Sequence, residues 1–343
     1  MSTQRRLTEA DLAEYLASVG IIPHGTAVRV EPAGAGNINW VRRVRSLGDG
    51  ASWVVKQARP ALERFPEYRA PTERAVFEAR YFETAAPFDR DGVCIGVAFF
   101  DERERVLVLE DLGDAAPLSA ALARGAASEV AAAACSLGAF LGAVHAGTRG
   151  QSLAGRFEND AMRRLHGDHI FHLPYRPNEF TLSPAVAARA EALRQDTALI
   201  ETIDAAYERY LRPEGALIHA DVQPDNVLLT PRGPRLLDAE IAHVGDPAFD
   251  VGILVAHLLL PAVAHGDESS APIGETWSAY ARAHGARGLP RFRDVARYAG
   301  IELLRRTIGA ARVAAVARDA AALDVIEAGI RLVTAPPDAL GRG

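Results

Sequence analysis

The pattern of the chain changes near residue 110, and this change constrains the fold more than any other feature. Before it, short apolar runs alternate with Gly, Pro and Asp, which is typical of strands joined by turns. After it, long Ala- and Leu-rich segments predict helices. The five predicted strands lie at 28–31, 38–45, 53–58, 93–100 and 105–109. We therefore predict an α+β fold with two lobes. Residues 1–110 would form a small five-stranded antiparallel sheet with one inserted helix, and residues 111–343 a larger, mainly helical lobe.

Helices are predicted in both lobes, and a cleft between two such lobes is a natural ligand site. The predicted helices lie at 8–19, 72–84, 126–145, 184–211 and, broken by Pro261, Pro272 and Pro290, 252–333. Gly48-Asp49-Gly50 predicts a hairpin between the second and third strands, and two short β segments are expected at 227–229 and 235–237. Residues 159–178 read as an irregular insertion, and their histidines His166, His169 and His172 as loop or core residues.

Composition and charge exclude several classes of protein. The chain is 49% hydrophobic and 24% charged, as in a globular protein with a large core. Its net charge of -6 and the lack of a basic tail argue against a nucleic-acid binder. The most apolar stretches, 131–144 and 251–264, are too short to span a bilayer, and no signal peptide is evident. Because Cys94 and Cys135 read as reduced core thiols, we expect a cytoplasmic protein.

Lys56 is the only lysine in the chain, among 37 arginines. A buried site that needs a compact ammonium distinguishes lysine from arginine, whose guanidinium is broad and planar. Lys56 lies in an apolar run that reads as a strand, about twenty residues after the Gly-rich segment 34–39. A Gly-rich turn followed by a strand lysine indicates a nucleotide phosphate site. Survival of one lysine by drift is the alternative, and the GC-rich character of the composition, which depletes lysine, weakens it.

The strongest local signal for chemistry is the segment 217–229, in which His219, Asp221 and Asn226 stand between two apolar runs. An Asp on such a loop can accept a proton from a substrate hydroxyl, and an Asn five residues later can reach a metal. Asp238 follows at the end of an apolar strand, where a carboxylate can meet Mg²⁺, and Glu240 is a candidate for an additional ligand of that metal.

Each of these residues also has a purely structural interpretation. Asp221 and Asn226 could stabilise turns, whereas Asp238 and Asp250 could cap helices. The order and spacing of the set, downstream of a Gly-rich turn and a strand lysine, favour the phosphate-transfer interpretation.

On these residues the chain resembles the protein-kinase-like small-molecule phosphotransferases, which include aminoglycoside phosphotransferases, choline kinases and methylthioribose kinases. The resemblance extends from about residue 28 to residue 313. Three segments look most like 5-methylthioribose kinase: residues 34–39, 109–112 and 304–309. In that family a tandem arginine on a late helix contacts the sugar, and Arg305-Arg306 occupy the matching place. A solvated helix face is the alternative for this pair.

The resemblance implies an ATP-dependent kinase that uses Mg²⁺ and phosphorylates a hydroxyl of a small molecule. Asp221 would orient the acceptor and take its proton, Asn226 and Asp238 would bind the metal with Glu240 as an additional ligand, and His219 and Asp250 would brace the loop. Glu78, or as a second choice Glu73, would steer Lys56. The residues expected at the nucleotide are Gly34, Gly36, Asn37, Asn39, Lys56, Glu78, Glu110 and Leu112.

The resemblance leaves the acceptor open. The loop residues Gln223 to Asn226 look more like those of aminoglycoside and choline kinases, because methylthioribose kinases tend to lack this Asn. An enzyme that inactivates an aminoglycoside or nucleoside antibiotic, and so confers resistance, is therefore an alternative to a sugar kinase. A regulatory pseudokinase is an alternative of another class. A homodimer is compatible with the sequence, which does not define the oligomeric state or the preference for ATP over GTP.

Overall fold

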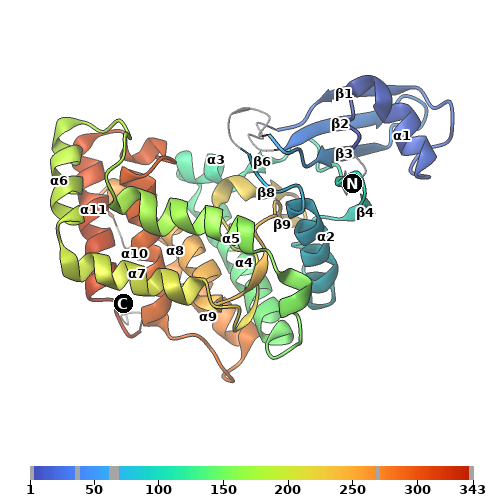
Figure 1. Cartoon of the computed structure of the whole chain (residues 1–343). Helices are drawn as coiled ribbons and strands as arrows, with labels where there is room; N and C mark the ends of the chain where they lie inside the picture. Colours follow the sequence, from blue (N-terminus) through green and yellow to red (C-terminus); the bar gives the residue numbers. More distant parts are fainter. Residues whose placement is uncertain (1–3, 35–38, 62–68, 268–270, 340–343) are drawn as a thin grey trace. The chain divides into compact units, whose positions relative to one another are not determined.

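The structure is a computed structural model that describes residues 4–34, 39–61, 69–267 and 271–339 (Figure 1). The chain forms two compact units. The first unit comprises residues 1–86 and 94–115, and the second comprises residues 87–93 and 116–343. The units are described separately below.

The first unit is built on a five-stranded antiparallel sheet in the order β1-β2-β3-β5-β4, so the predicted sheet is confirmed. Its strands are β1 (Val28–Pro32), β2 (Trp40–Ser46), β3 (Ser52–Gln57), β4 (Val97–Asp101) and β5 (Val106–Glu110). The predicted hairpin joins β2 to β3, with Gly50 in the left-handed conformation at φ 75°. Strand β4 begins at Val97, four residues later than predicted, since only an isolated bridge forms at Cys94.

The two faces of this sheet have different partners. A 3-10 turn at Glu9–Asp11 leads into α1 (Leu12–Ser18), and Leu12 and Leu16 share a buried core with Val55 of β3. Consecutive residues of a strand point to opposite faces, so Lys56 points away from this core. On that side it meets α2 (Arg74–Ala85), which packs on β4 and β5. The alternation within β3 therefore separates an apolar face from a face that carries the lysine.

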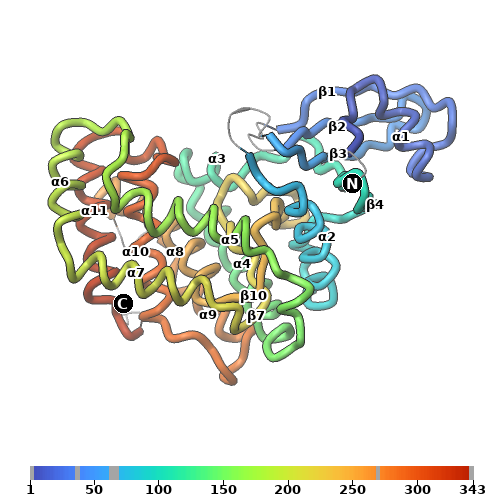
Figure 2. The backbone as a smooth tube through the Cα atoms, viewed as in Figure 1, coloured from blue at the N-terminus to red at the C-terminus, as the bar shows by residue number. Residues whose placement is uncertain are grey.

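The second unit is mainly helical (Figure 2). Its helices are α3 (Leu118–Ala123), α4 (Ala127–Thr148), α5 (Asp160–Gly167), α6 (Pro184–Arg194), α7 (Thr197–Tyr210), α8 (Pro247–Ala264), α9 (Ile273–His284), α10 (Phe292–Ile308) and α11 (Asp319–Thr334). Helix α4 packs along α9, and α10 packs against both α8 and α11. Short strands complete the unit: β7 (Ala216–Ile218) pairs with β10 (His243–Gly245), and β8 (Val227–Thr230) pairs with β6 (Ala116–Pro117) and β9 (Gly233–Leu236).

Four expectations about this unit are wrong. The helix predicted at 184–211 is divided into α6 and α7, because Asp196 begins a new helix by accepting the Leu199 N–H at 3.1 Å. Residues 159–178 are largely helical, because α5 continues into a π-helix at Asp168–His172 and a 3-10 turn at Leu173–Tyr175. Pro261 does not interrupt α8, which continues to Ala264, so the helix accommodates the one backbone hydrogen bond that a proline cannot donate. The same helix begins at Pro247 instead of residue 252, and its cap is Asp246, whose carboxylate accepts from the Ala248 N–H at 3.1 Å.

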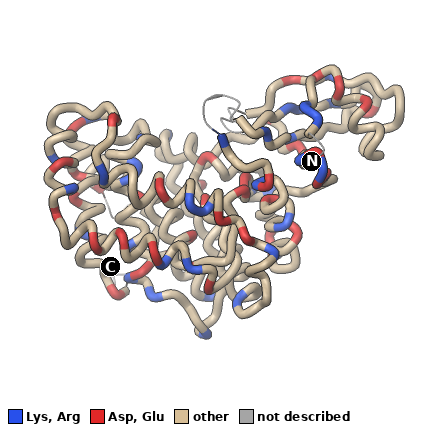
Figure 3. Tube along the Cα trace, viewed as in Figure 1, with Lys and Arg blue, Asp and Glu red and all other residues tan. Residues whose placement is uncertain are grey.

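Helices α4 and α8 extend beyond the apolar stretches recognised in the sequence, and both are long and apolar enough to cross a membrane. Core helices of folded proteins pass the same test, and 89% of the apolar window of α8 is buried inside the structure. Acidic and basic residues are interspersed along the trace in Figure 3.

Candidate active site

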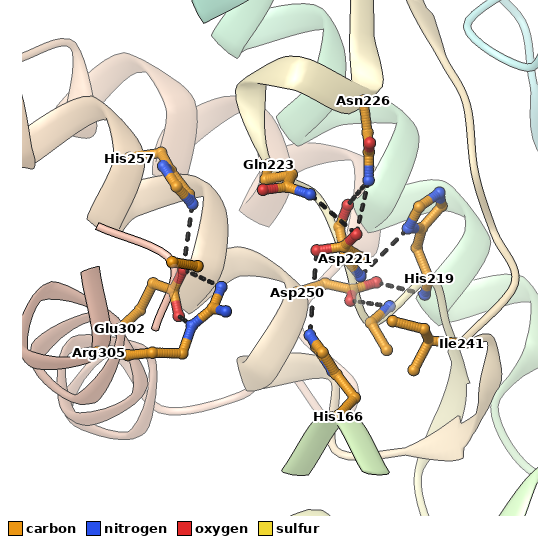
Figure 4. Close-up of polar contacts among 12 residues, drawn as sticks. His166, His219, Asp221, Gln223, Asn226, Ile241, Asp250, His257, Glu302 and Arg305 are labelled. Atoms are coloured by element: carbon orange, nitrogen blue, oxygen red, sulfur yellow. Dashed lines mark hydrogen bonds and ion pairs between the residues drawn. The ribbon is translucent and has the colours of Figure 1, made fainter. Parts of the chain in front are cut away.

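The loop between β7 and β8 holds its shape through Asp250, a fully buried residue in the first turn of α8. The Asp250 carboxylate accepts the backbone N–H of His219 at 2.8 Å and that of Ala220 at 2.7 Å. Ala220 has φ 67°, a left-handed conformation that is costly for a residue with a side chain. The two hydrogen bonds hold this strained turn, which immediately precedes Asp221 (Figure 4).

Asp250 is itself held as a carboxylate by a second layer of contacts. His145 of α4 lies with Nε2 3.2 Å from Asp250 Oδ2, and Tyr280 of α9 contacts the other ring nitrogen at 3.2 Å. Burial alone would raise the pKa of Asp250, but the hydrogen bond and charge of His145 and the bonds from the loop lower it below its ordinary value. The Asp250 carboxylate is thus held by His145 from one side and stabilises the loop after β7 from the other.

His219 connects the loop to the segment that carries Asp238. Its Nδ1 accepts the Asp221 N–H at 3.2 Å, and its Nε2 donates to the Leu237 carbonyl at 2.9 Å. A neutral imidazole offers one acceptor and one donor, so both contacts are made by a single tautomer. His219 therefore braces two backbone segments and keeps Asp221 and Asp238 on neighbouring stretches of chain.

The Asp221 carboxylate lies at the centre of the candidate site (Figure 4). Its Oδ2 accepts from Asn226 Nδ2 at 2.7 Å and from Gln223 Nε2 at 3.1 Å. The side chain is only 16% exposed. Burial raises the pKa of Asp221 to about 6, against the opposing charges of Arg306 and Arg305 and the hydrogen bond from Asn226. A carboxylate with this pKa is ionised at neutral pH and still basic enough to accept a proton.

Asn226, Asp238 and Glu240 offer the oxygen ligands that Mg²⁺ prefers. Asn226 donates both of its side-chain N–H bonds to Asp221, to the carboxylate and to the backbone carbonyl, so its amide oxygen is the atom left for a cation. Asp238 has φ 59°, another left-handed residue, two positions after the end of β9. Strained backbone at such a position is common at ligand sites. The described residues contain no group of three or more His, Cys, Asp or Glu placed to hold a metal, so a site here depends on the Asn226 amide.

Arg305 and Arg306 lie on α10, close enough to Asp221 that their positive charges lower its pKa. Each is only 7% exposed, so their interpretation as a solvated helix face is wrong. The fully buried Glu302 binds both guanidinium groups, with Arg305 Nε at 2.6 Å and Arg306 Nε at 2.7 Å. Arg306 also donates to the side-chain oxygen of Gln223, which in turn contacts Asp221. A hydrogen-bonded chain therefore runs from α10 to Asp221.

In the first unit, Lys56 forms an ion pair with Glu78 of α2, with Nζ 2.8 Å from Oε2. Both side chains are buried. Glu73, the other candidate partner, lies 3.8 Å from Arg105 instead. Residues five apart on a helix differ by about 140° around its axis, so only one of the two faces the strand.

The glycine-rich turn is described in part. Gly34 has φ 69°, and a Cβ there would meet nothing within 4 Å, so glycine is needed for the backbone conformation and not for space. Gly36 and Asn37 lie outside the described residues. Asn39 is buried, and its side-chain oxygen accepts from two nitrogens of Arg74, Nε at 3.1 Å and Nη2 at 2.8 Å. Asn39 therefore anchors the end of the turn to α2 through its side chain.

Glu110 and Leu112 flank the end of β5. The Glu110 backbone N–H donates to the Gly96 carbonyl at 2.9 Å, and its carboxylate accepts the Gly96 N–H at 2.6 Å. Between the two residues, Asp111 forms an ion pair with Arg43 at 3.0 Å. The segment is thus tied to β2 and to the start of β4.

Sequence reasoning missed four residues of the site: His166, Gln223, His257 and Glu302. His257 lies with Nε2 3.2 Å from Glu302 Oε1 and completes the cluster behind the arginines. Glu302 precedes Arg305 and Arg306 by three and four residues, a spacing that places ion pairs on one helix face and could have identified it. His166 offered no such local signal, because it meets Asp221 only through the packing of α5.

Comparisons with known proteins agree with this geometry. The family model described as "Phosphotransferase enzyme family" matches residues 29–294. The chain is 28% identical to a methylthioribose kinase of Pectobacterium carotovorum subsp. carotovorum (strain PC1), over 92% of this chain and 88% of that protein. A methylthioribose kinase of Geobacillus sp. (strain WCH70) is 26% identical, over 90% of this chain and 84% of its own length.

Solved structures show the fold. A choline kinase from Streptococcus pneumoniae superposes with a TM-score of 0.53 at 14% identity, covering 95% of this chain and 98% of its own. A spectinomycin phosphotransferase, solved with ADP and spectinomycin, gives a TM-score of 0.53 at 11% identity, covering 97% and 99%. The predicted protein-kinase-like fold and the predicted family are therefore confirmed. The chain belongs to the phosphotransferase enzyme family and is an ATP-dependent kinase of a small molecule.

Proposed function

We propose that this kinase phosphorylates a hydroxyl of a sugar or sugar-containing compound such as 5-methylthioribose. The observation that carries the proposal is the buried arginine pair of α10, which Gln223 connects to Asp221. Guanidinium groups present several N–H donors in a planar fork and suit the closely spaced oxygens of a sugar. The names of the relatives support the same acceptor.

In the proposed reaction, Asp221 accepts the proton of the acceptor hydroxyl as its oxygen bonds to the γ-phosphorus of ATP. The bond between that phosphorus and the β,γ-bridging oxygen breaks, and ADP leaves with the electron pair. Phosphoryl transfer depends mostly on positioning and charge stabilisation, so few groups are needed. The strained turn at Ala220 and the anion of Asp250 keep Asp221 in position for this step.

At the nucleotide, Lys56 would bind the α- and β-phosphates as a point charge, held in place by Glu78. The backbone of the turn that contains Gly34, Gly36, Asn37 and Asn39 would lie over the phosphates, and backbone groups from Glu110 to Leu112 would bind adenine.

We propose Mg²⁺ as the metal, held by Asn226 and Asp238 with Glu240 as an additional ligand. When bound, this ion neutralises charge on the phosphates. The donor set of one amide and two carboxylates fits a hard cation.

The charge around Asp221 disfavours an aminoglycoside as the acceptor. The two positive charges of Arg305 and Arg306 are balanced by the carboxylates of Glu302 and Asp221, so this cluster has no excess negative charge. An aminoglycoside is a polycation and would gain little electrostatic attraction there. A neutral nucleoside antibiotic needs no such attraction, and it stays the second candidate. A pseudokinase is disfavoured because Asp221, Asn226 and Asp238 are all present.

We further propose a cytoplasmic protein without nucleic-acid or membrane partners. The net charge of -6 and the burial of the apolar helices α4 and α8 support this. A homodimer is a proposal that the sequence permits, and measurement of the mass in solution would test it.

The decisive experiment measures ADP release with Mg-ATP and a panel of acceptors: 5-methylthioribose, other pentoses, nucleosides, aminoglycosides and choline. We expect turnover with methylthioribose or a related sugar and none with aminoglycosides. Arg305→Ala should raise KM for the sugar and leave KM for ATP unchanged. Turnover with an aminoglycoside alone would contradict the proposed acceptor class.

A further inference from the structure

His166 of α5 lies beside the candidate base, although no sequence motif connects the two. Its Nε2 is 4.0 Å from Asp221 Oδ1 (Figure 4). The other carboxylate oxygen, Oδ2, accepts from Asn226 and Gln223. His166 therefore faces the oxygen of Asp221 that makes no hydrogen bond to the described part of the chain.

The proton of this imidazole can be assigned from its other neighbour. His166 Nδ1 lies 3.4 Å from the hydroxyl of Tyr210, a fully buried residue at the end of α7. Among the described residues, the His166 ring is the hydrogen-bond partner of that hydroxyl. Since a buried hydroxyl donates where it can, the Tyr210 O–H donates to Nδ1, and Nε2 carries the ring proton. Burial, with the nearby charge of Arg305, lowers the pKa of His166 well below its ordinary value, so the ring is neutral.

The distance between the two groups suits a bridging oxygen. At 4.0 Å, Nε2 and Oδ1 are too far apart for a direct hydrogen bond. One oxygen atom can lie about 2.8 Å from both, accepting from Nε2–H and donating its own proton to Oδ1. A hydroxyl group has this combination of donor and acceptor.

Packing fixes the ring at this place. Gly167 follows His166, and a Cβ there would lie 2.5 Å from the Tyr207 ring, so glycine lets α5 approach α7 closely. The edge of the His166 ring packs on Phe249, with ring centroids 6.3 Å apart and planes at 85°. The chain then continues as a π-helix, a conformation frequent at functional sites.

We propose that His166 binds the acceptor: its Nε2–H donates to the same hydroxyl oxygen whose proton Asp221 Oδ1 accepts. This rests on the proposed role of Asp221 as the base. The two hydrogen bonds would orient the hydroxyl and leave a lone pair of its oxygen for attack. Tyr210 acts through His166 as a positioning residue, because it selects the tautomer that carries the Nε2 proton.

The test compares His166→Leu, which removes the donor, with His166→Gln, whose amide N–H can take the place of Nε2–H. Steady-state rates are measured with 5-methylthioribose, or with the acceptor that the ADP-release panel selects. We expect His166→Leu to lower kcat/KM for the acceptor roughly 3- to 15-fold, as for loss of one neutral hydrogen bond, with KM for ATP unchanged. His166→Gln should restore most of this loss. The matched control is His172→Leu, because the His172 side chain is on the same segment and is 40% exposed. Its kcat/KM should equal that of wild type.

Equal losses in the Leu and Gln variants, or a parallel rise of KM for ATP, would show that His166 acts only on the fold. Tyr210→Phe gives a second line of evidence should His166→Leu fail to fold, and it should also raise KM for the acceptor. Asp221→Asn distinguishes failure of the proposed role of His166 from failure of the proposed function. An inactive Asp221→Asn with a fully active His166→Leu overturns only this inference, whereas an active Asp221→Asn overturns the proposed function as well.

Discussion

At the scale of single residues, Asp221 shows how function and stability oppose each other. Burial raises its pKa to about 6, so the folded protein holds the proton more tightly than the unfolded chain does. Ionisation of Asp221 above this pH therefore costs folding free energy. The difference from the ordinary value of 3.8 corresponds to about 3 kcal/mol at neutral pH. The same burial supplies a base that is active near pH 7.

Asp221→Asn should lose activity and gain stability. We expect turnover to fall by ~10²–10⁴-fold because the base is absent, with ATP binding retained. The melting temperature at pH 8 should rise above that of wild type. The gain should shrink as the pH falls through about 6 and become small near pH 4, where the folded wild-type carboxyl is protonated and the unfolded one is close to its own pKa of 3.8. Asp225→Asn, on the same loop but exposed, is the control. A destabilised Asp221→Asn at pH 8 would show that its hydrogen bonds outweigh its desolvation.

At the scale of secondary-structure elements, a buried ion pair and a close helix–helix contact join elements that are distant in sequence. The Lys56–Glu78 ion pair connects β3 to α2, and both side chains are buried. Removal of one partner of a buried pair is costly because the other charge keeps its desolvation penalty, whereas removal of both can be nearly neutral.

We therefore predict that Lys56→Met destabilises the first unit by about 3–5 kcal/mol. The double variant Lys56→Met with Glu78→Met should recover most of that stability and stay inactive with ATP. Denaturant unfolding and ADP release measure the two effects separately. Recovery of activity in the double variant would contradict a role of Lys56 at the phosphates.

The close packing of α4 on α9 depends on glycine. A Cβ at Gly142 would lie 2.4 Å from the Tyr280 carbonyl oxygen, which is backbone and cannot turn aside. Tyr280 also contacts His145, which holds Asp250, so this helix pair supports the catalytic loop from behind.

Gly142→Val should separate these helices and destabilise the second unit by about 1–3 kcal/mol, as for other overpacked cores. Thermal unfolding and turnover should both decline. Gly155→Val is the matched control, because a Cβ at Gly155 meets nothing within 4 Å. Equal melting temperatures for the Gly142 variant and wild type would mean that α9 shifts without cost.

At the scale of the whole molecule, buried carboxylates and buried histidines determine how stability depends on pH. The pKa of Asp250 and that of Glu302 are lowered, because partner histidines and arginines outweigh the effect of burial. A lowered folded-state pKa gives stability that is present above the unfolded value near pH 4 and is lost as the pH falls through the folded value.

We predict a melting temperature that falls as the pH drops from 7 to 5, because the unfolded chain protonates its histidines near pH 6.5 whereas burial lowers the pKa of His243 and that of His257 to about 4. Protonation of Asp221 offsets part of this loss, and the melting temperature falls steeply below about pH 4. Asp250→Asn should lower the melting temperature at pH 7 and flatten the acid limb. The control is Asp114→Asn, since the Asp114 side chain is 99% exposed. An acid limb of unchanged steepness in Asp250→Asn would assign the acid sensitivity to other groups.

Local patterns in the sequence were sufficient for the fold class and for the candidate loop. Strand alternation, the hairpin at Gly48–Gly50 and the spacing from His219 to Asp238 are short-range properties of the chain. The predictions that are wrong concern segments whose structure depends on long-range packing. Residues 159–178 looked irregular because His, Pro and aromatic residues have weak helix propensity, yet packing of Phe171 on Tyr207 and Phe249 makes them helical.

The linear chain is enough to identify the family, the two-part architecture and the phosphotransferase order of Lys56, Asp221 and Asn226. Which residues meet is settled by the tertiary structure. It paired Lys56 with Glu78 instead of Glu73, buried Arg305 and Arg306 around Glu302, and brought His166 to Asp221. These contacts depend on how helices pack, and packing is set by side chains far apart in the chain, which no local pattern records.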